Sequence, residues 1–217
     1  MARPLRPDRR HGAPRAARVG GAAAWRARCG GTVALHASRA AFAVAGTPLA
    51  PERLLHDGDE IPWAEGTLRV VHTPGHESGH CCLFEPTRGW LFTGDTVLST
   101  GTTVIAPPDG DMQAYLASLE RLRGLGAATI FPGHGPPLAD PTAVLDRYLA
   151  HRRAREAQIA AAVAAGVETI PALVAHCYPD LHPGLRWAAA LTVQAHLTKL
   201  ARDGGAAVTA DGRWRPA

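Results

Sequence analysis

Short apolar runs alternate with turn-forming residues in the middle of the chain. The runs 68–71, 81–84 and 90–93 have the length and composition of β-strands, and turns rich in proline and glycine separate them. A fourth run of this kind, Ile130-Phe131, is followed by Pro132-Gly133. The pattern therefore predicts a series of short strands that end in tight turns.

Helical spacing dominates the second half of the chain. A helix is expected from Met112 to Leu125, because apolar residues recur at helical intervals after the capping sequence Asp109-Gly110-Asp111. Two later helices and a hairpin with an Asp-Gly turn look like a winged-helix module. The further predicted segments are helices at 141–165, 169–177 and 183–203 and a hairpin at 206–214.

Three less regular segments complete the pattern. Residues 37–46 and 48–55 are expected to form a short linker or helix, and Asp57-Gly58-Asp59-Glu60 is a strong turn sequence. The charged run 151–156 on the long helix is predicted to be a solvated face with salt bridges, and the alternative is that its histidine and arginine lie near the interface between the body and the terminal module.

Three of the predicted strands are followed by a residue that can bind a metal. His76 follows a Pro-Gly turn, Asp95 follows Thr-Gly, and His134 follows Pro-Gly. Imidazole nitrogen and carboxylate oxygen are ligands that zinc prefers, and loop ends are common places for them. A single histidine in such a position is more often an ordinary turn residue, so the ordered set of three is what indicates a metal site.

The segments TPGHESGH, FTGD and FPGHGP, in this order, resemble the metallo-β-lactamase superfamily of metal-dependent hydrolases. The later helix with HRRAREAQI and the terminal module resemble its β-lactamase-like-protein-2 branch. The resemblance implies an α+β fold, namely an αββα sandwich followed by a helical, winged-helix-like C-terminal domain. It also implies hydrolysis of an ester, thioester or phosphodiester by a hydroxide that zinc activates, so the substrate is a small molecule or a nucleic acid.

The resemblance assigns roles to individual residues. It implies that His76 is a ligand of the first metal site, His134 a ligand of the second, and Asp95 the catalytic carboxylate that bridges two zinc ions. Three further residues, His80, Thr102 and Thr103, are expected to support the ligands or line the pocket.

One motif of the family is missing. The superfamily places His-x-His-x-Asp-His before a Gly-Gly pair, which corresponds here to Gly20-Gly21, but alanine lacks a donor atom and arginine stays protonated. The four ligand positions are occupied by Ala13, Arg15, Ala17 and Arg18. The strands expected before this motif are also absent, so the sandwich is expected to be partial.

The missing motif changes the expected activity. Only two ligands would remain for each metal ion, which is too few for tight binding. We therefore expect weak or absent metal binding and severely reduced hydrolysis. The alternative is an inactive remnant that acts as a nucleic-acid or protein binding module.

The expected domains follow from these assignments. Residues 1–18 are an arginine-rich segment, expected to be disordered or to come from a misread gene, although it also resembles a transit peptide in being rich in arginine and nearly free of acidic residues. Residues 19–140 form the incomplete metallo-β-lactamase body, and residues 141–217 form a linker helix and the winged-helix-like domain.

Charge and composition exclude few functions for this chain. The net charge is +4, but residues 1–30 hold eight arginines against one aspartate, so most of the basicity lies outside the predicted body. The basic pI is therefore poor evidence for nucleic-acid binding. No apolar run reaches the roughly 18 residues of a membrane span, and four cysteines without a C-x-x-C pair favour a reducing compartment. These features predict a cytoplasmic protein without membrane partners.

Overall fold

The computed structural model describes residues 34–36, 43–44, 47–48, 53–63 and 66–217. The arginine-rich segment 1–18, with the four substituted ligand positions, lies outside these residues. So do most of the residues between 19 and 52.

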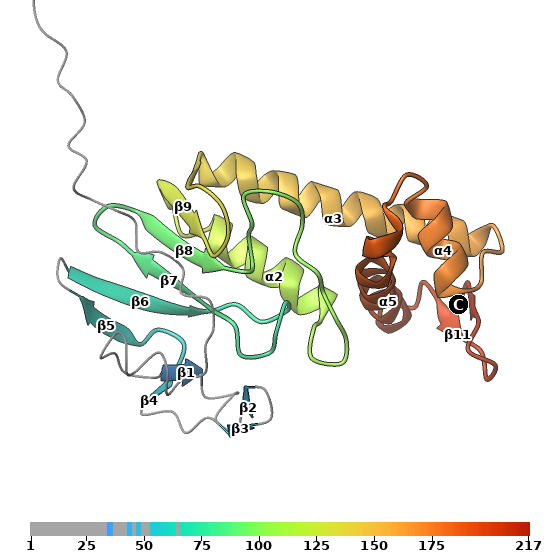
Figure 1. Ribbon diagram of the computed structural model, residues 1–217, viewed down its shortest axis with the longest axis horizontal. Coiled ribbons are helices and arrows are strands. Elements are labelled where there is room, and N and C mark those ends of the chain that lie inside the picture. The colour runs from blue at the N-terminus through green and yellow to red at the C-terminus, as the bar shows by residue number, and fades with distance from the viewer. Residues whose placement is uncertain (1–33, 37–42, 45–46, 49–52, 64–65) are drawn as a thin grey trace, which may run out of the picture.

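A six-stranded sheet forms the body of the protein (Figure 1). Its strand order is β10-β9-β8-β7-β6-β5, and all neighbours are antiparallel except the parallel pair β8 and β9. The predicted short strands and the turn at Asp57-Gly58 are confirmed, with slightly longer strands. Their bounds are β5 Glu60–Trp63, β6 Gly66–His72, β7 Cys81–Glu85, β8 Trp90–Gly94, β9 Thr129–Pro132 and β10 Leu138–Ala139.

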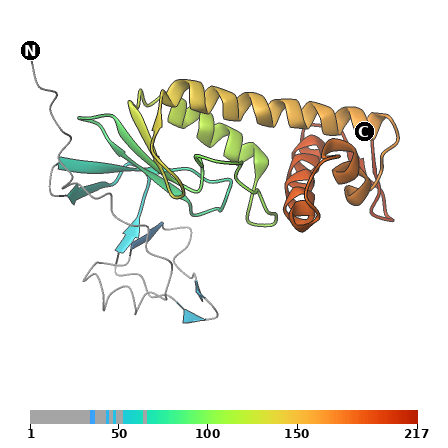
Figure 2. The same ribbon diagram turned by 45° about the horizontal axis from the view of Figure 1, so that its top comes forward.

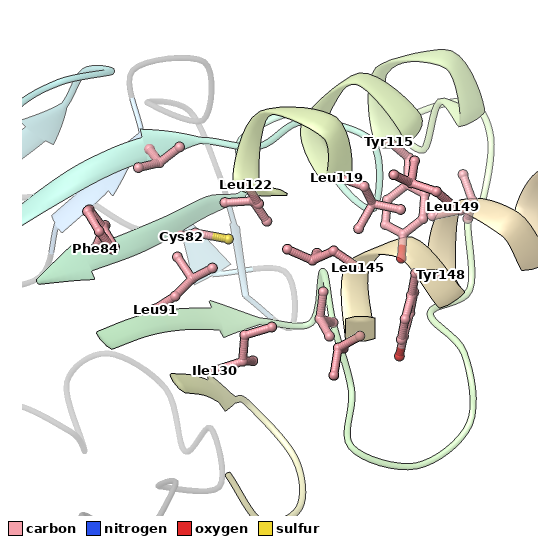
Figure 3. Packing of buried hydrophobic residues seen from close by; sticks show 14 of the residues in the cluster. Cys82, Phe84, Leu91, Tyr115, Leu119, Leu122, Ile130, Leu145, Tyr148 and Leu149 are labelled. Atoms are coloured by element: carbon pink, nitrogen blue, oxygen red, sulfur yellow. The ribbon is translucent and has the colours of Figure 1, made fainter. Parts of the chain in front are cut away.

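Two helices, α2 (Met112–Arg123) and α3 (Pro141–Ala164), cover one face of this sheet (Figures 1 and 2). Alternate strand residues point toward them, so Leu91 is fully buried beside its partner Ile130. Figure 3 shows Cys82 and Leu91 of the sheet opposite Leu122 and Leu145 of the helices. This apolar layer is the main core of the body.

The other face of the sheet carries aromatic side chains. Phe92 stacks on Phe131 with ring centroids 5.1 Å apart, and Trp90 meets Phe131 edge-on at 5.5 Å. Trp63 completes the cluster by edge contacts with Trp90 and Phe92. Packing sheet on sheet across such a face is what defines the sandwich class.

Short strands precede the sheet. β1 (Ala34–His36) pairs with β4 (Arg53–Leu55) in parallel, and β2 (Ala43–Val44) pairs with β3 (Thr47–Pro48). The prediction of a linker or helix at 48–55 is therefore wrong for the end of that segment. Pairing with a distant strand, which local sequence does not reveal, determines its conformation.

The C-terminal module has its own core. Its elements are α4 (Ile170–Cys177), a 3₁₀ turn η2 (Pro183–Leu185), α5 (Arg186–Arg202), β11 (Ala207–Val208) and β12 (Trp214–Arg215). The late part of α3 packs into this second core, whereas the early part packs into the body. The single helix predicted at 183–203 begins instead as a 3₁₀ turn, because His182 caps it through Gly184. Among the described residues, no helix is long and apolar enough to cross a membrane.

We expect Leu91→Ala to lower the free energy of unfolding by about 2–5 kcal/mol, because it leaves a cavity under the sheet. Urea denaturation measures the change. The matched control is Leu185→Ala, whose side chain is 53% exposed and should change stability by less than about 0.5 kcal/mol. Equal effects of the two substitutions would contradict the burial described here.

Candidate active site

The topology brings three loops to one edge of the sheet. β8 and β9 are parallel, and β6 has the same direction because both it and β8 are antiparallel to β7. Strands that run the same way end at the same edge of a sheet. His76, Asp95 and His134 each follow one of these three strand ends, so the structure places all three loops along one rim.

Asp95 and His134 form the closest pair of predicted ligands. His134 Nε2 lies 3.4 Å from Asp95 Oδ1, and the two side chains are 76% and 46% exposed, in the order His134 and Asp95. The backbone around them is well fixed, since Gly133 N donates to Gly94 O at 2.8 Å and Ser99 Oγ donates to His134 O at 3.1 Å. The two side chains are therefore open to solvent, while hydrogen bonds fix the backbone next to them.

His76 is oriented by a carbonyl. Its Nδ1 lies 2.9 Å from Val104 O. A carbonyl can only accept, so Nδ1 carries the hydrogen and Nε2 keeps its lone pair. The His76 ring meets His80 edge-on, with centroids 6.3 Å apart. Histidine ligands of metals commonly have one ring nitrogen fixed in this way.

His80 lies behind these loops. Its Nδ1 is 2.9 Å from Thr73 Oγ1 and 3.0 Å from Thr96 Oγ1, while Nε2 packs so closely on Gly94 that an added Cβ would lie 2.7 Å away. Burial, assisted by the neighbouring His76, lowers the pKa of His80 to about 4. The imidazole is therefore neutral near pH 7 and links the first loop to the second.

The two threonines predicted to line the pocket differ in position. Thr103 is buried, and its hydroxyl donates to Asp95 O at 2.7 Å and to Thr96 O at 3.2 Å. Thr102 is exposed at the surface of the same loop. Thr103 thus supports the backbone that carries Asp95, whereas a pocket role for Thr102 stays a prediction.

Two tyrosines on the predicted helices also bind the loop 95–105. Tyr115 of α2 donates from its hydroxyl to Thr96 O at 2.7 Å, and Tyr148 of α3 donates to Leu98 O at 2.9 Å. Figure 3 shows both rings between α2, α3 and this loop. A buried tyrosine needs a partner for its hydroxyl, and this requirement is the sequence signal for their role.

The loop that carries His76 is fixed by α2. Ser118 Oγ donates to Pro74 O at 2.8 Å, and the N–H of Asp111 donates to Gly75 O at 2.9 Å. Gly75 has φ of 132°, and a Cβ there would lie 2.3 Å from the Tyr115 Cα. The glycine is therefore required by both conformation and space.

The described residues do not by themselves fit a metal centre. In the part of the chain that the structure describes, no group of three or more His, Cys, Asp or Glu residues is placed to hold a metal ion. Asp95 and His134 supply a pair of donors, and His76 supplies a third on a separate loop. The donors have the right chemistry, but the set is too small for a complete shell.

Comparison with known proteins establishes the class of this chain. The metallo-beta-lactamase superfamily matches residues 8–134, and the beta-lactamase associated winged helix domain matches residues 169–214. The chain belongs to the metallo-β-lactamase superfamily. The first matched range includes positions 13–18, where alanine and arginine stand in place of the motif's ligands.

Individual relatives point to the branch. A beta-lactamase-like protein 2 homolog from Caenorhabditis elegans is 35% identical over 149 residues, which cover 68% of this chain and 49% of that protein. A thioesterase from Emericella nidulans is 35% identical over 113 residues, covering 52% of this chain and 32% of its own. The crystal structure of a metallo-beta-lactamase family protein from Thermus thermophilus superposes with a TM-score of 0.70 and 28% identity, covering 79% of this chain and 56% of its own. The chain thus spans about half the length of these relatives or less.

We expect His80 to titrate with a midpoint near pH 4, which NMR of its ring protons measures directly. Because the folded pKa lies below the ordinary value of 6.5, the unfolded state binds a proton that the native state does not between these values. The free energy of unfolding should therefore fall as the pH drops from 6.5 toward 4.

His80→Gln removes the titrating group, so its stability should depend less steeply on pH across that window. A midpoint close to 6.5 for the native His80 ring would contradict the burial assigned to it.

Proposed function

We propose that the protein is a metallo-β-lactamase-fold hydrolase of an ester, thioester or phosphodiester, whose site is incomplete in the chain as written. The observation that carries the proposal is the pair of Asp95 and His134, 3.4 Å apart, at the edge of the sheet where the loop of His76 also lies. Membership of the superfamily supports hydrolysis as the reaction class. The thioesterase among the relatives favours a thioester as the first substrate to test.

The small number of metal-binding residues limits the hydrolytic activity that we propose. Zinc, two ions per chain, is the cofactor that the family chemistry would use, and His76, Asp95 and His134 are the residues that would hold it. The described donors are too few for this task, so we assign no catalytic step to a metal. We infer that Asp95 and the two histidines remain as a partial site with severely reduced turnover.

Restoring the missing ligands tests this inference. We expect the purified chain to bind well below one zinc ion per molecule, and the variant Ala13→His, Arg15→His, Ala17→Asp, Arg18→His to bind zinc more tightly, because four donors are added. Isothermal titration with zinc measures the affinity, and release of thiol from a short acyl thioester measures activity.

The control for the restored variant is the additional change His134→Ala, which should abolish the gain in both readouts. Stoichiometric, tightly held zinc in the unaltered chain would contradict the proposal of an incomplete site.

A second candidate function is a binding module for nucleic acid or protein. At the start of α5, Trp187 is 64% exposed and Leu185 is 53% exposed. An exposed tryptophan next to Arg186 can stack on a base of single-stranded nucleic acid. Lys199 on the same helix contributes little, since Glu156 and Asp203 already bind its ammonium group.

Fluorescence anisotropy with a labelled single-stranded RNA tests the binding function. Salt-dependent binding that survives His76→Ala and weakens at least several-fold in Trp187→Ala is the expected outcome, because stacking on an aromatic ring contributes about 1–3 kcal/mol. Unchanged binding in Trp187→Ala would exclude this surface as the binding site.

A further inference from the structure

Arg152 is an unusual residue in the middle of α3. Its side chain is only 2% exposed, whereas His151 and Arg153 on either side are exposed. The prediction that the run 151–156 forms a solvated face is therefore wrong at this position, because the 3.6-residue period turns Arg152 toward the core. Removing a guanidinium from water is costly unless protein groups replace the lost hydration.

The partners of Arg152 are neutral. Within the described parts of the chain, no carboxylate forms an ion pair with it, and Glu156, one turn later, binds His196 and Lys199 instead. A terminal nitrogen of Arg152 donates to the carbonyl of Thr103. The guanidinium also lies over the ring of Tyr115, 5.2 Å from its centroid.

The carbonyl that Arg152 binds belongs to the loop that serves the candidate site. The hydroxyl of Thr103 donates to Asp95 O, and the next carbonyl, that of Val104, accepts the Nδ1 hydrogen of His76. Both contacts come from two consecutive residues without regular secondary structure. Arg152 therefore binds the peptide group between Thr103 and Val104, and His76 binds the next one, between Val104 and Ile105. The backbone of Val104 joins the two contacts, so the orientation of the first peptide group affects that of the second.

We propose that Arg152 is a positioning residue for His76. By fixing the Thr103 carbonyl toward α3, it keeps the Val104 carbonyl directed at His76 Nδ1, and this contact leaves the Nε2 lone pair for the site. The value of this orientation for hydrolysis rests on the proposed function. The orientation itself does not, because it is a property of the folded chain without any ligand.

If Arg152 has only a structural role, a different result is expected from its substitution. Apolar residues of similar volume often replace buried charged groups without loss of stability. If Arg152 only fills space between α3 and the loop, Arg152→Met should preserve the loop and the state of His76. If Arg152 positions His76, the same substitution frees the Thr103 carbonyl and weakens the hold on the His76 ring.

The experiment is ¹⁵N NMR of the histidine side chains in the full chain, at a pH where the imidazole is neutral. His76→Gln identifies the resonances. We expect the wild-type ring to be almost wholly in the Nδ1–H tautomer. Arg152→Met should shift it mostly to the Nε2–H tautomer, and Arg152→Lys, which can still donate to the carbonyl, should restore part of the original state.

Arg153→Met is the matched control, since this exposed neighbour forms its ion pair with Glu120 at the surface, and it should leave the tautomer unchanged. A folded Arg152→Met variant that keeps the Nδ1–H tautomer would overturn the proposal. If that variant does not fold, Arg152→Lys decides in its place, because a ring as fully in the Nδ1–H tautomer as in the wild type would then overturn the proposal. An Nε2–H tautomer in the wild type would overturn it as well, since it contradicts the contact with Val104. Failure of the zinc and thioester experiments would leave this measurement unaffected, so the two proposals fail separately.

Discussion

Buried carbonyl groups without regular secondary structure impose the main constraint on this protein. The loop 95–105 follows β8 and carries Asp95, and those of its carbonyls that are buried or half-buried need donors from the protein. Side chains supply these donors: the hydroxyls of Thr103, Tyr115 and Tyr148 and the guanidinium of Arg152. The two helices are thus more than a cover for the sheet, since they hold the backbone that positions Asp95 and His76.

The strands and the helices of the second half could be predicted from the sequence because their signals are local. Turn residues bracket each strand, and Asp111 and Asp140 cap α2 and α3 in the structure. The candidate site residues could also be predicted from the sequence, since His76, Asp95 and His134 each follow the end of a strand. That the three loops lie at one edge depends on the directions of the strands, which only the pairing of the sheet supplies.

The contacts behind the site could not be predicted in this way. Arg152 and Thr103 are 49 residues apart, and Tyr148 and Leu98 are 50 apart. Helical spacing identifies an inward-facing position but not the carbonyl that lies opposite it. The strand β4 was missed for the same reason, since its partner β1 is distant in the sequence. The expectations for residues 1–18 lie outside the described residues and remain predictions.

We propose that the protein keeps part of a metal site, while the residues at positions 13, 15, 17 and 18 supply no ligands to complete it. A crystal structure grown with excess zinc, with anomalous differences collected at the zinc absorption edge, tests this claim most directly. We predict at most weak, partly occupied density beside Asp95 and His134. A fully occupied zinc ion bound by His76, Asp95 and His134 together would contradict the account.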